Sequence, residues 1–401
     1  MMKLFGALLI LLIVNNNTWA TNSDSIKSNI LFISVKGNYG TALKSNDFVR
    51  GQNANNEAID QFKEFSALFG LQTIGKEEWE QLHKMPAYGI GLSVIRINNE
   101  AEMGKPFSAY GFYHGVIHRW SKSALRYDVE LGLAFNWKCF DLQSNPYNIA
   151  IGSKITSRIC LGLDYELLIA KNCMLTFGGN FTHFSNGAIR KPNKGINFVS
   201  PFISFSYLFD NHELKPLVTD IKKEQHHEVQ ISVGYGIKQE ENVLWQNPEL
   251  TSVYEKLQKY HVFTLKTNYM RQYCQKGKWG GGVNICFDEW RGSKIRIDAN
   301  GKARKVLSHC SHEPIIGLFL SHELLISKVG IVTDLGGNVY MSYSHVEYQN
   351  RKILFERLGV KYYFPYNIFA GVNVFANGVK ANIIEWNMGY ALQWHKRSVD
   401  R

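Results

Sequence analysis

Proline is scarce in this chain, and long apolar runs are missing after its first twenty residues. Only 9 prolines occur among 401 residues, which suits a protein of long strands, because proline is kept out of the middle of a sheet. A membrane-spanning helix needs about 20 consecutive apolar residues, and no such run follows residue 20. The sequence therefore argues against a helical membrane protein.

Patterns for metal or nucleic-acid binding are also missing. None of the 6 cysteines has Cys-x-x-Cys spacing, which disfavours zinc. The pairs His226-His227 and His309/His312 lack a carboxylate or cysteine to complete a ligand set. The net charge is +11, but the basic residues are dispersed and no nucleic-acid motif accompanies them. We expect no metal, no cofactor and no nucleic-acid partner.

The chain begins with a segment typical of export. Lys3 supplies a positive charge, an apolar stretch follows, and Thr18-Trp19-Ala20 forms a small-residue cleavage site. We predict a signal peptide over 1–20, with an uncleaved anchor as the alternative. Disulfides are permitted in an exported chain, yet isolated thiols are the simpler expectation.

Alternation of apolar and polar residues at period two dominates the rest of the chain. The predicted strands of a first set are Ile30–Gly40, Phe65–Ile74, Ala87–Ile97, Phe107–His118, Ala124–Lys138, Lys154–Ile169, Cys173–Phe184 and Ile196–Phe209. Those of a second set are His226–Lys238, Lys259–Gln272, Trp279–Glu289, Glu313–Ile326, Val329–Tyr343, Ile353–Phe364, Ile368–Asn377 and Asn382–Leu392.

The lengths of these runs favour a membrane barrel over a soluble sandwich. A tilted strand needs about 9–11 residues to cross a bilayer, whereas strands of soluble sheets average about 5–6. Short links such as Ala170-Lys171-Asn172 alternate with long ones such as Trp290–His312, as in outer-membrane barrels. Trp120, Trp137, Trp279 and Trp290 fall near run ends, where interfacial aromatics are expected.

The predicted fold is an all-β antiparallel transmembrane barrel of the cell outer membrane. Two architectures fit: one barrel of about 14–16 strands, or an eight-stranded barrel over 21–209 followed by a second β module over 226–394. The segment 210–225 is a charged connection and 395–401 a charged tail. Because tandem barrels in one chain are expected to be rare, we favour the single large barrel.

Candidate catalytic residues gather in the hairpin from Phe181 to Asn197. His183 and Ser185 share one strand face, roughly 7 Å apart along the backbone. Asn197 can lie opposite them on the next strand, about 5 Å away between Cβ atoms. This is the apolar face, which meets lipid in a barrel and where polar groups are unusual. A base, a nucleophile and an orienting group can therefore meet on the lipid-facing wall.

The residues His183-Phe184-Ser185-Asn186-Gly187-Ala188 and Pro192-Asn193-Lys194-Gly195-Ile196 resemble the signature of the outer-membrane lipid A 3-O-deacylases, the PagL or acyloxyacyl hydrolase family. The resemblance is strongest over 154–209. It implies an eight-stranded barrel that hydrolyses an ester-linked acyl chain of lipid A, or lipopolysaccharide, without a cofactor. By motif position it implies Ser185 as nucleophile and His183 as general base. It also implies that Asn186 and Asn193 orient the site or stabilise the oxyanion.

One position departs from the family pattern. The family usually carries glutamate where this chain has Asn197. An asparagine can still accept the imidazole N–H but offers no negative charge. Asp164 and Glu166 are close in the sequence, yet their strand parity points them into the barrel. On this expectation activity is weaker or absent, or another acid replaces the glutamate.

Other functions and a duplication stay open at this stage. A non-catalytic barrel, either a porin or a structural wall protein, is the alternative function, and a soluble secreted β protein is the third. Loop cations such as Arg190 and Arg291 either face anionic outer-membrane lipids or are solvated. Leu161–Tyr165 and Leu358–Tyr362 open similar hairpins. In that alignment Ala376 stands at the position of His183, so an internal repeat would carry one site only.

Overall fold

The computed structural model describes residues 29–210, 226–240, 259–291, 293–297, 303–341, 353–378 and 380–395. The predicted signal peptide over 1–20, residues 211–225 of the predicted connection and residues 396–401 of the tail lie outside the described residues. No helix among the described residues is long and apolar enough to cross a membrane.

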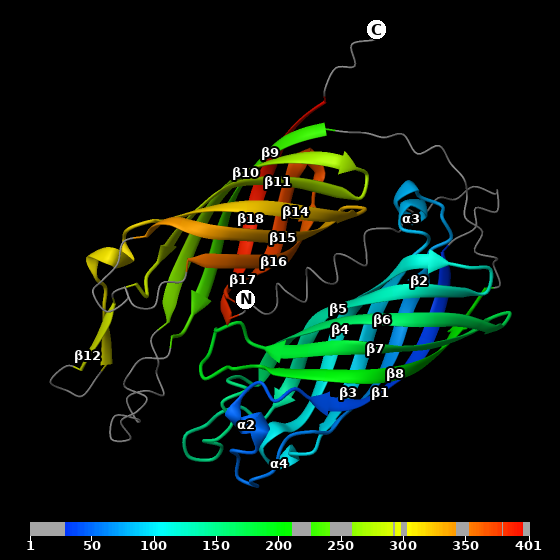
Figure 1. The fold of residues 1–401 in the computed structure, drawn as a ribbon, viewed down its shortest axis with the longest axis horizontal. Coiled ribbons are helices and arrows are strands. Elements are labelled where there is room, and N and C mark those ends of the chain that lie inside the picture. Colours follow the sequence, from blue (N-terminus) through cyan, green and yellow to red (C-terminus); the bar gives the residue numbers. More distant parts are fainter. Residues whose placement is uncertain are drawn as a thin grey trace. The chain divides into compact units, whose positions relative to one another are not determined.

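The chain forms two closed antiparallel barrels of eight strands each (Figure 1). The first consists of β1 (Ile30–Ala42), β2 (Phe62–Gln72), β3 (Ala87–Ile97), β4 (Gly104–Arg119), β5 (Ser123–Trp137), β6 (Ile155–Ala170), β7 (Cys173–Ser185) and β8 (Ile196–Leu208). The second consists of β9 (His226–Lys238), β10 (Tyr260–Cys274), β11 (Gly277–Asp288), β14 (Ile315–Ile326), β15 (Val329–Met341), β16 (Leu354–Tyr363), β17 (Ile368–Asn377) and β18 (Lys380–His395).

The preference for a single large barrel is wrong, because β8 pairs with β1 and β18 pairs with β9, so each set of strands closes on itself. An eight-stranded barrel followed by a second β module, the other predicted architecture, is the observed one. Every predicted strand corresponds to a barrel strand. The sequence reading missed the small hairpin of β12 (Lys294–Ile297) and β13 (Ala303–Val306) within the predicted loop 290–312. Short strands of four residues are too brief to show a periodic pattern.

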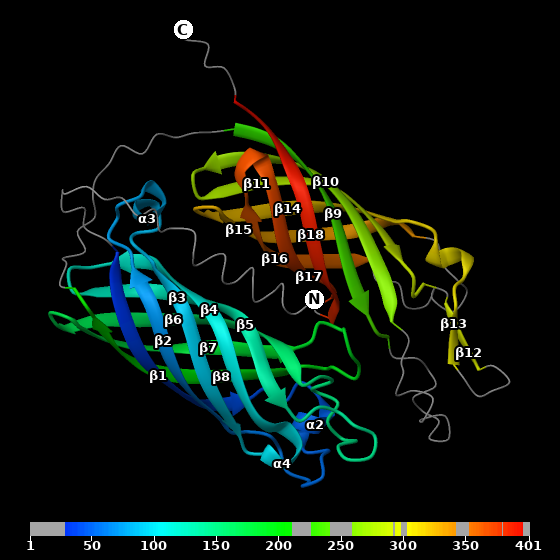
Figure 2. The ribbon, with the colours of Figure 1, turned by 180° about the vertical axis from the view of Figure 1, so that it is seen from behind.

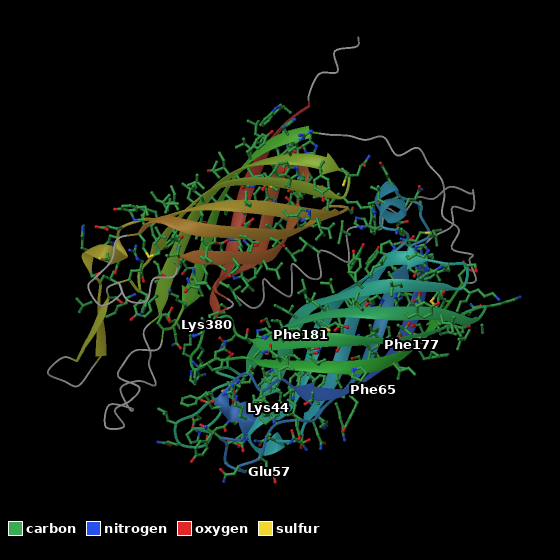
Figure 3. The ribbon with its side chains drawn as sticks, in the orientation of Figure 1. Lys44, Glu57, Phe65, Phe177, Phe181 and Lys380 are labelled. Atoms are coloured by element: carbon green, nitrogen blue, oxygen red, sulfur yellow. The ribbon has the colours of Figure 1, made fainter. Side chains whose placement is uncertain are left out.

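Strand alternation gives each barrel an apolar outer wall and a polar interior. In β8 the inward Phe198 is fully buried, whereas the outward Val199 is 43% exposed. Phe177 and Phe181 of β7 lie on the outside of the first barrel (Figure 3). An exposed apolar wall of this kind is the lipid-facing surface of a membrane barrel.

Most long connections of the first barrel lie at one end, and its two shortest turns lie at the other. The long connections 43–61, which contains α2 (Asp47–Arg50), 138–154 and 186–195 lie at one end, together with the short link 98–103 that contains α4 (Glu100–Met103). The connection 73–86, which contains α3 (Glu78–Leu82), lies at the other end (Figure 2). The links 120–122 and 171–172 are the short turns on the α3 side. In outer-membrane barrels the long loops are extracellular and the short turns periplasmic. The α2 and α4 end is therefore the extracellular end.

An apolar core fills the extracellular end of the first barrel. It combines inward side chains of the strands with residues from α2 and the long loops. Phe62 stacks on Phe198 with ring centroids 4.2 Å apart, and Trp137 meets Phe184 edge to face at 5.2 Å. Trp137 is only 2% exposed, so its expected place at the membrane interface is wrong. Strand-end position alone does not distinguish an inward tryptophan from an outward one.

Below this core, ion pairs fill the barrel interior. Arg158 is fully buried and contacts both Glu64 and Glu130, with its Nη1 2.6 Å from Glu64 Oε1. Lys36 Nζ lies 2.9 Å from Glu130 Oε1. Asn38 also donates to Glu64. Cations and amides from several strands contact these carboxylates, which is what a buried charge requires.

The second barrel has an interior of the same kind built from different residues. Arg357 is fully buried between Asp334, at 3.1 Å, and Glu385, at 3.1 Å. Lys361 Nζ lies 2.8 Å from Glu323 Oε2. The remaining short elements are η3 (His309–Ser311) and η5 (Pro365–Asn367). All six cysteines are free thiols, and no group of three potential ligands in the described part of the chain could hold a metal.

Candidate active site

The hairpin of β7 and β8 brings three polar side chains together on the outer wall of the first barrel. His183 and Ser185 are two residues apart near the extracellular end of β7, and the register pairs His183 directly with Asn197 of β8. His183 and Asn197 are half-buried, and Ser185 is 8% exposed. The neighbours Phe184 and Ile196 point into the barrel and are fully buried. The strand parity of the sequence therefore describes this wall correctly.

A chain of two hydrogen bonds joins the three side chains. His183 Nε2 lies 2.9 Å from Ser185 Oγ, and His183 Nδ1 lies 2.6 Å from Asn197 Oδ1. An amide oxygen only accepts hydrogen bonds, so Nδ1 of the imidazole is the donor. The neutral ring then has a free lone pair on Nε2, which accepts the hydroxyl proton of Ser185. This is the tautomer that a general base needs.

The strand that carries these residues rests on the rigid core of the barrel end. Phe184 stands between His183 and Ser185 in sequence and packs inward against Trp137 and Phe198. Because a packed inward residue fixes the strand on both sides of it, the two outward side chains keep a constant spacing. The core thus supports the geometry of the wall.

Gly195 closes the hairpin where no other residue fits. Its φ is +74°, and a Cβ at this position would lie 2.9 Å from His183 Cε1. Its N–H donates to Ala150 O at 3.0 Å, and its carbonyl accepts from Asn46 Nδ2 at 3.1 Å. A side chain would be strained and would push the imidazole away. This explains physically why a glycine stands in the Pro-Asn-x-Gly part of the motif.

Asn186 and Asn193 organise the loop that follows the serine. The backbone N–H of Asn186 donates to Asn193 Oδ1 at 3.2 Å, and Asn186 Nδ2 donates to Arg190 O at 2.8 Å. Gly187 and Ala188 take positive φ values of 59° and 68° within the turn. Both asparagines are therefore placed as braces of the loop next to Ser185. Their expected action on an oxyanion stays a prediction.

Two supporting residues escaped the sequence analysis. The hydroxyl of Ser157, on β6, donates to the backbone carbonyl of Ser185 at 2.7 Å, and the N–H of Leu43 donates to Asn197 O at 2.8 Å. Each of these two hydrogen bonds holds the backbone of a proposed site residue in place. A lone serine and a lone leucine carry no motif, so only the strand register reveals them.

No carboxylate in the described segments is hydrogen-bonded to His183. Asp164 and Glu166, the two acids close in sequence, are buried inside the barrel and both contact Arg126. Their inward parity was predicted correctly. Asn197 is thus the partner of the imidazole in the position where the family pattern has glutamate.

The corresponding position of the second barrel has no such residues. β16 and β17 form a hairpin that corresponds to the hairpin of β6 and β7. Ala376 pairs with Glu356 in the second barrel, at the position where His183 pairs with Ile159 in the first. Gly378 lies two residues after Ala376, as Ser185 lies two residues after His183. Ala381 of β18 pairs with Ala376, as Asn197 of β8 pairs with His183. None of these three can act as base, nucleophile or orienting group. Within the described residues, this polar constellation lies in the first barrel and has no counterpart at the equivalent positions of the second.

Family comparisons agree with this division of the chain. Residues 65–206 match the model of the lipid A 3-O-deacylase (PagL) family. Residues 227–394 match the model described as the acyloxyacyl hydrolase C-terminal domain. The first match covers the barrel that carries the three polar residues, and the second covers the other barrel. No curated protein matches the chain.

Solved structures of two outer-membrane proteins are similar to the chain at low identity. The outer-membrane enzyme PagL is 13% identical and covers 43% of this chain and 97% of its own, with a TM-score of 0.29. The siderophore receptor PirA from Pseudomonas aeruginosa is 10% identical, covering 91% and 81%, with a TM-score of 0.21. TM-scores this low carry no weight, so the assignment depends on the two matched segments.

The fold and the lipid-facing wall define an outer-membrane β-barrel protein. Within that class, the chain belongs to the PagL lipid A deacylase and acyloxyacyl hydrolase family, whose two domain models it matches in succession.

Proposed function

We propose that the first barrel is an esterase that removes an ester-linked acyl chain from lipid A. The observation that carries the proposal is the hydrogen-bonded series Ser185–His183–Asn197 on the outer wall near the extracellular end. An ester in the outer leaflet is reached only from the bilayer side. A nucleophile on the lipid-facing wall suits such a substrate, whereas a soluble ester would need one in a water-filled cleft.

The reaction follows from the donors and acceptors of the site. Ser185 Oγ attacks the acyl carbonyl carbon while its proton passes to His183 Nε2. The tetrahedral intermediate collapses, the bond to the sugar oxygen breaks, and this oxygen takes the proton from His183. Water then attacks the acyl-serine with His183 as base, which releases the fatty acid and restores the serine. Asn197 holds the imidazole in the required tautomer throughout.

An oxyanion donor is proposed from the loop after the nucleophile. The N–H of Asn186 directly follows Ser185, the place from which other serine hydrolases supply such a donor. In the substrate-free protein this N–H donates to Asn193 Oδ1 at 3.2 Å. A full negative charge accepts more strongly than an amide oxygen, so a developing oxyanion would replace that bond.

Product analysis tests the activity directly. Purified full-length protein incubated with lipid A should yield lipid A lacking one ester-linked acyl chain together with the matching free fatty acid, both detected by mass spectrometry. The amide-linked chains should stay in place, because a serine esterase of this kind attacks the more reactive ester. An unchanged lipid A spectrum after prolonged incubation with folded protein would contradict the proposal.

A non-catalytic barrel is the competing function, and no observation favours it. Charged side chains in contact with one another fill the described interior of both barrels, whereas a porin needs an open aqueous lumen. Ion conductance across planar bilayers, in the absence of any acyl product, is the result that would support a porin.

The departure at Asn197 can be tested by restoring the acid. The Asn197→Glu variant should hydrolyse lipid A faster than the wild type, by roughly 10-fold, because a carboxylate stabilises the imidazolium that forms during attack. Asn197→Ala should be slower than the wild type, since Nδ1 then loses its acceptor. Initial rates of fatty-acid release measure both. Equal rates for all three proteins would show that position 197 does not orient the histidine.

A further inference from the structure

Three cations form a cluster on the outer wall of the first barrel, on strands that carry none of the proposed catalytic residues. Lys63 of β2 lies directly opposite Arg96 of β3 in the register, and Lys105 begins the outward face of β4. All three side chains are exposed. They lie near the extracellular end of their strands, next to α4. We call Lys63, Arg96 and Lys105 the cationic cluster.

The neighbouring acidic groups do not neutralise the cationic cluster. Glu100 of α4 is shared between Arg96 Nε, at 3.5 Å, and Lys105 Nζ, at 3.2 Å. Lys63 Nζ lies over the ring of Tyr39 at 5.6 Å from its centroid. No other carboxylate in the described part of the chain forms an ion pair with these three cations.

Asp60 lies in the connection just before β2, three residues before Lys63. Its Oδ1 accepts a hydrogen bond from Asn98 Nδ2 at 3.0 Å, so it is already engaged. Like charges placed directly opposite on neighbouring strands destabilise a sheet. The pairing of Lys63 with Arg96 is therefore a cost to the free protein that a bound anion would remove.

The position of the cationic cluster along the membrane normal indicates which kind of anion it faces. The next outward positions towards the middle of the three strands are Phe65, Val94 and Phe107. Their side chains are 57%, 50% and 48% exposed. These three are paired across the strands and form an apolar band; Phe65 is labelled in Figure 3. Acyl chains pack on such a band, and headgroups lie at the level just beyond it. The cluster is thus at the headgroup level of the outer leaflet.

We infer that the cationic cluster is a binding site for the phosphate groups of an outer-leaflet glycolipid, with the acyl chains of that lipid on the apolar band below. Arg96 offers a planar fork and the two lysines offer point charges, a combination that suits phosphate oxygens. The site lies on β2, β3 and β4, whereas Ser185 and His183 lie on β7. It would hold a lipid as a ligand and not as a substrate, and it does not depend on the proposed esterase activity.

Lipid retention tests the inference. The full chain in detergent is loaded with diphosphorylated lipid A, washed, and analysed by native mass spectrometry, with Ser185→Ala in every protein so that lipid is not consumed. The variant Lys63→Gln/Arg96→Gln/Lys105→Gln should retain at least about tenfold less lipid A than its parent, because it lacks the three charges that attract the phosphates. Raising the salt concentration should weaken retention by the parent protein.

Matched controls separate the phosphate from other contributions. Lys122→Gln/Lys171→Gln removes cations from the periplasmic turns and should leave retention unchanged. Glu100→Gln removes the competing carboxylate and should increase retention. Lipid A freed of its phosphates should bind parent and triple variant equally. Equal retention of the phosphorylated lipid by parent and triple variant would overturn the inference, and phosphatidylglycerol bound as well as lipid A would overturn the assignment to a glycolipid.

Discussion

Ser185→Ala is expected to abolish fatty-acid release from lipid A, with the rate falling by at least about 10³-fold, as expected for loss of a nucleophile and its general-base partner. His183→Ala should have a similar effect, because the hydroxyl of Ser185 is then left without an acceptor for its proton. In the proposed mechanism the two residues act as one unit, because Ser185 Oγ lies 2.9 Å from His183 Nε2. The double variant should therefore be no slower than either single variant. Fatty acid released per unit time is the measurement.

Both substitutions should leave the barrel intact. Ser185 and His183 point outward, and the packing of the strand depends on the inward Phe184. A suitable control is Thr333→Ala, which removes an exposed outward hydroxyl from β15 of the second barrel and should keep full activity. Undiminished release by Ser185→Ala and His183→Ala, in protein that still inserts into membranes, would rule out the Ser/His mechanism.

Arg158→Met is expected to destabilise the first barrel by about 3–5 kcal/mol, the usual cost of removing one partner from a buried ion pair. Arg158 supplies the cation for Glu64, and the neutral Asn38 and Ser93 also donate hydrogen bonds to this carboxylate. Glu130 keeps Lys36. The substitution therefore leaves the Glu64 carboxylate charged, buried and without a cation. The midpoint of urea unfolding, measured in lipid vesicles, should fall accordingly.

A second substitution identifies the cause of that loss. Adding Glu64→Gln to Arg158→Met removes the stranded charge and should recover part of the stability, while Glu64→Gln alone should be destabilising. Lys122→Met, in an exposed periplasmic turn, should leave the midpoint unchanged. If the double variant is no more stable than Arg158→Met, loss of packing and not the uncompensated charge explains the effect.

Strand positions could be predicted from the sequence because each barrel strand has one face in lipid. The inward Phe198 and Phe202 of β8 blurred the pattern locally, yet the outward residues kept the period of two. Barrel closure could not be predicted, since it depends on which strands share an edge. Sixteen strands allow one closed sheet or two, and the alternation of faces is the same in both cases. The pairing of β8 with β1 is a contact between distant residues that no local pattern shows.

The polar site could be predicted in part, for a similar reason. His183 and Ser185 share a face by parity, and Asn197 follows from a hairpin register. The roles of Gly195 and Ser157 depend on contacts across strands and loops, to His183 Cε1 and to the backbone of Ser185 respectively. Such contacts have no signature in the order of residues. For the same reason the cationic cluster was not seen: Lys63 and Arg96 are 33 positions apart in the chain and become neighbours only through the β2–β3 register.

The amide at position 197 gives the proposed mechanism a simple response to acid. A carboxylate in this position would take up a proton at low pH and lose its charge, so that the orienting bond and the base would both change with acidity. Asn197 has no proton to gain or lose over that range, and its Oδ1 accepts from Nδ1 of both the neutral and the protonated imidazole. Within the hydrogen-bonded series, the imidazole of His183 is then the single group whose protonation would stop the proposed reaction in acid.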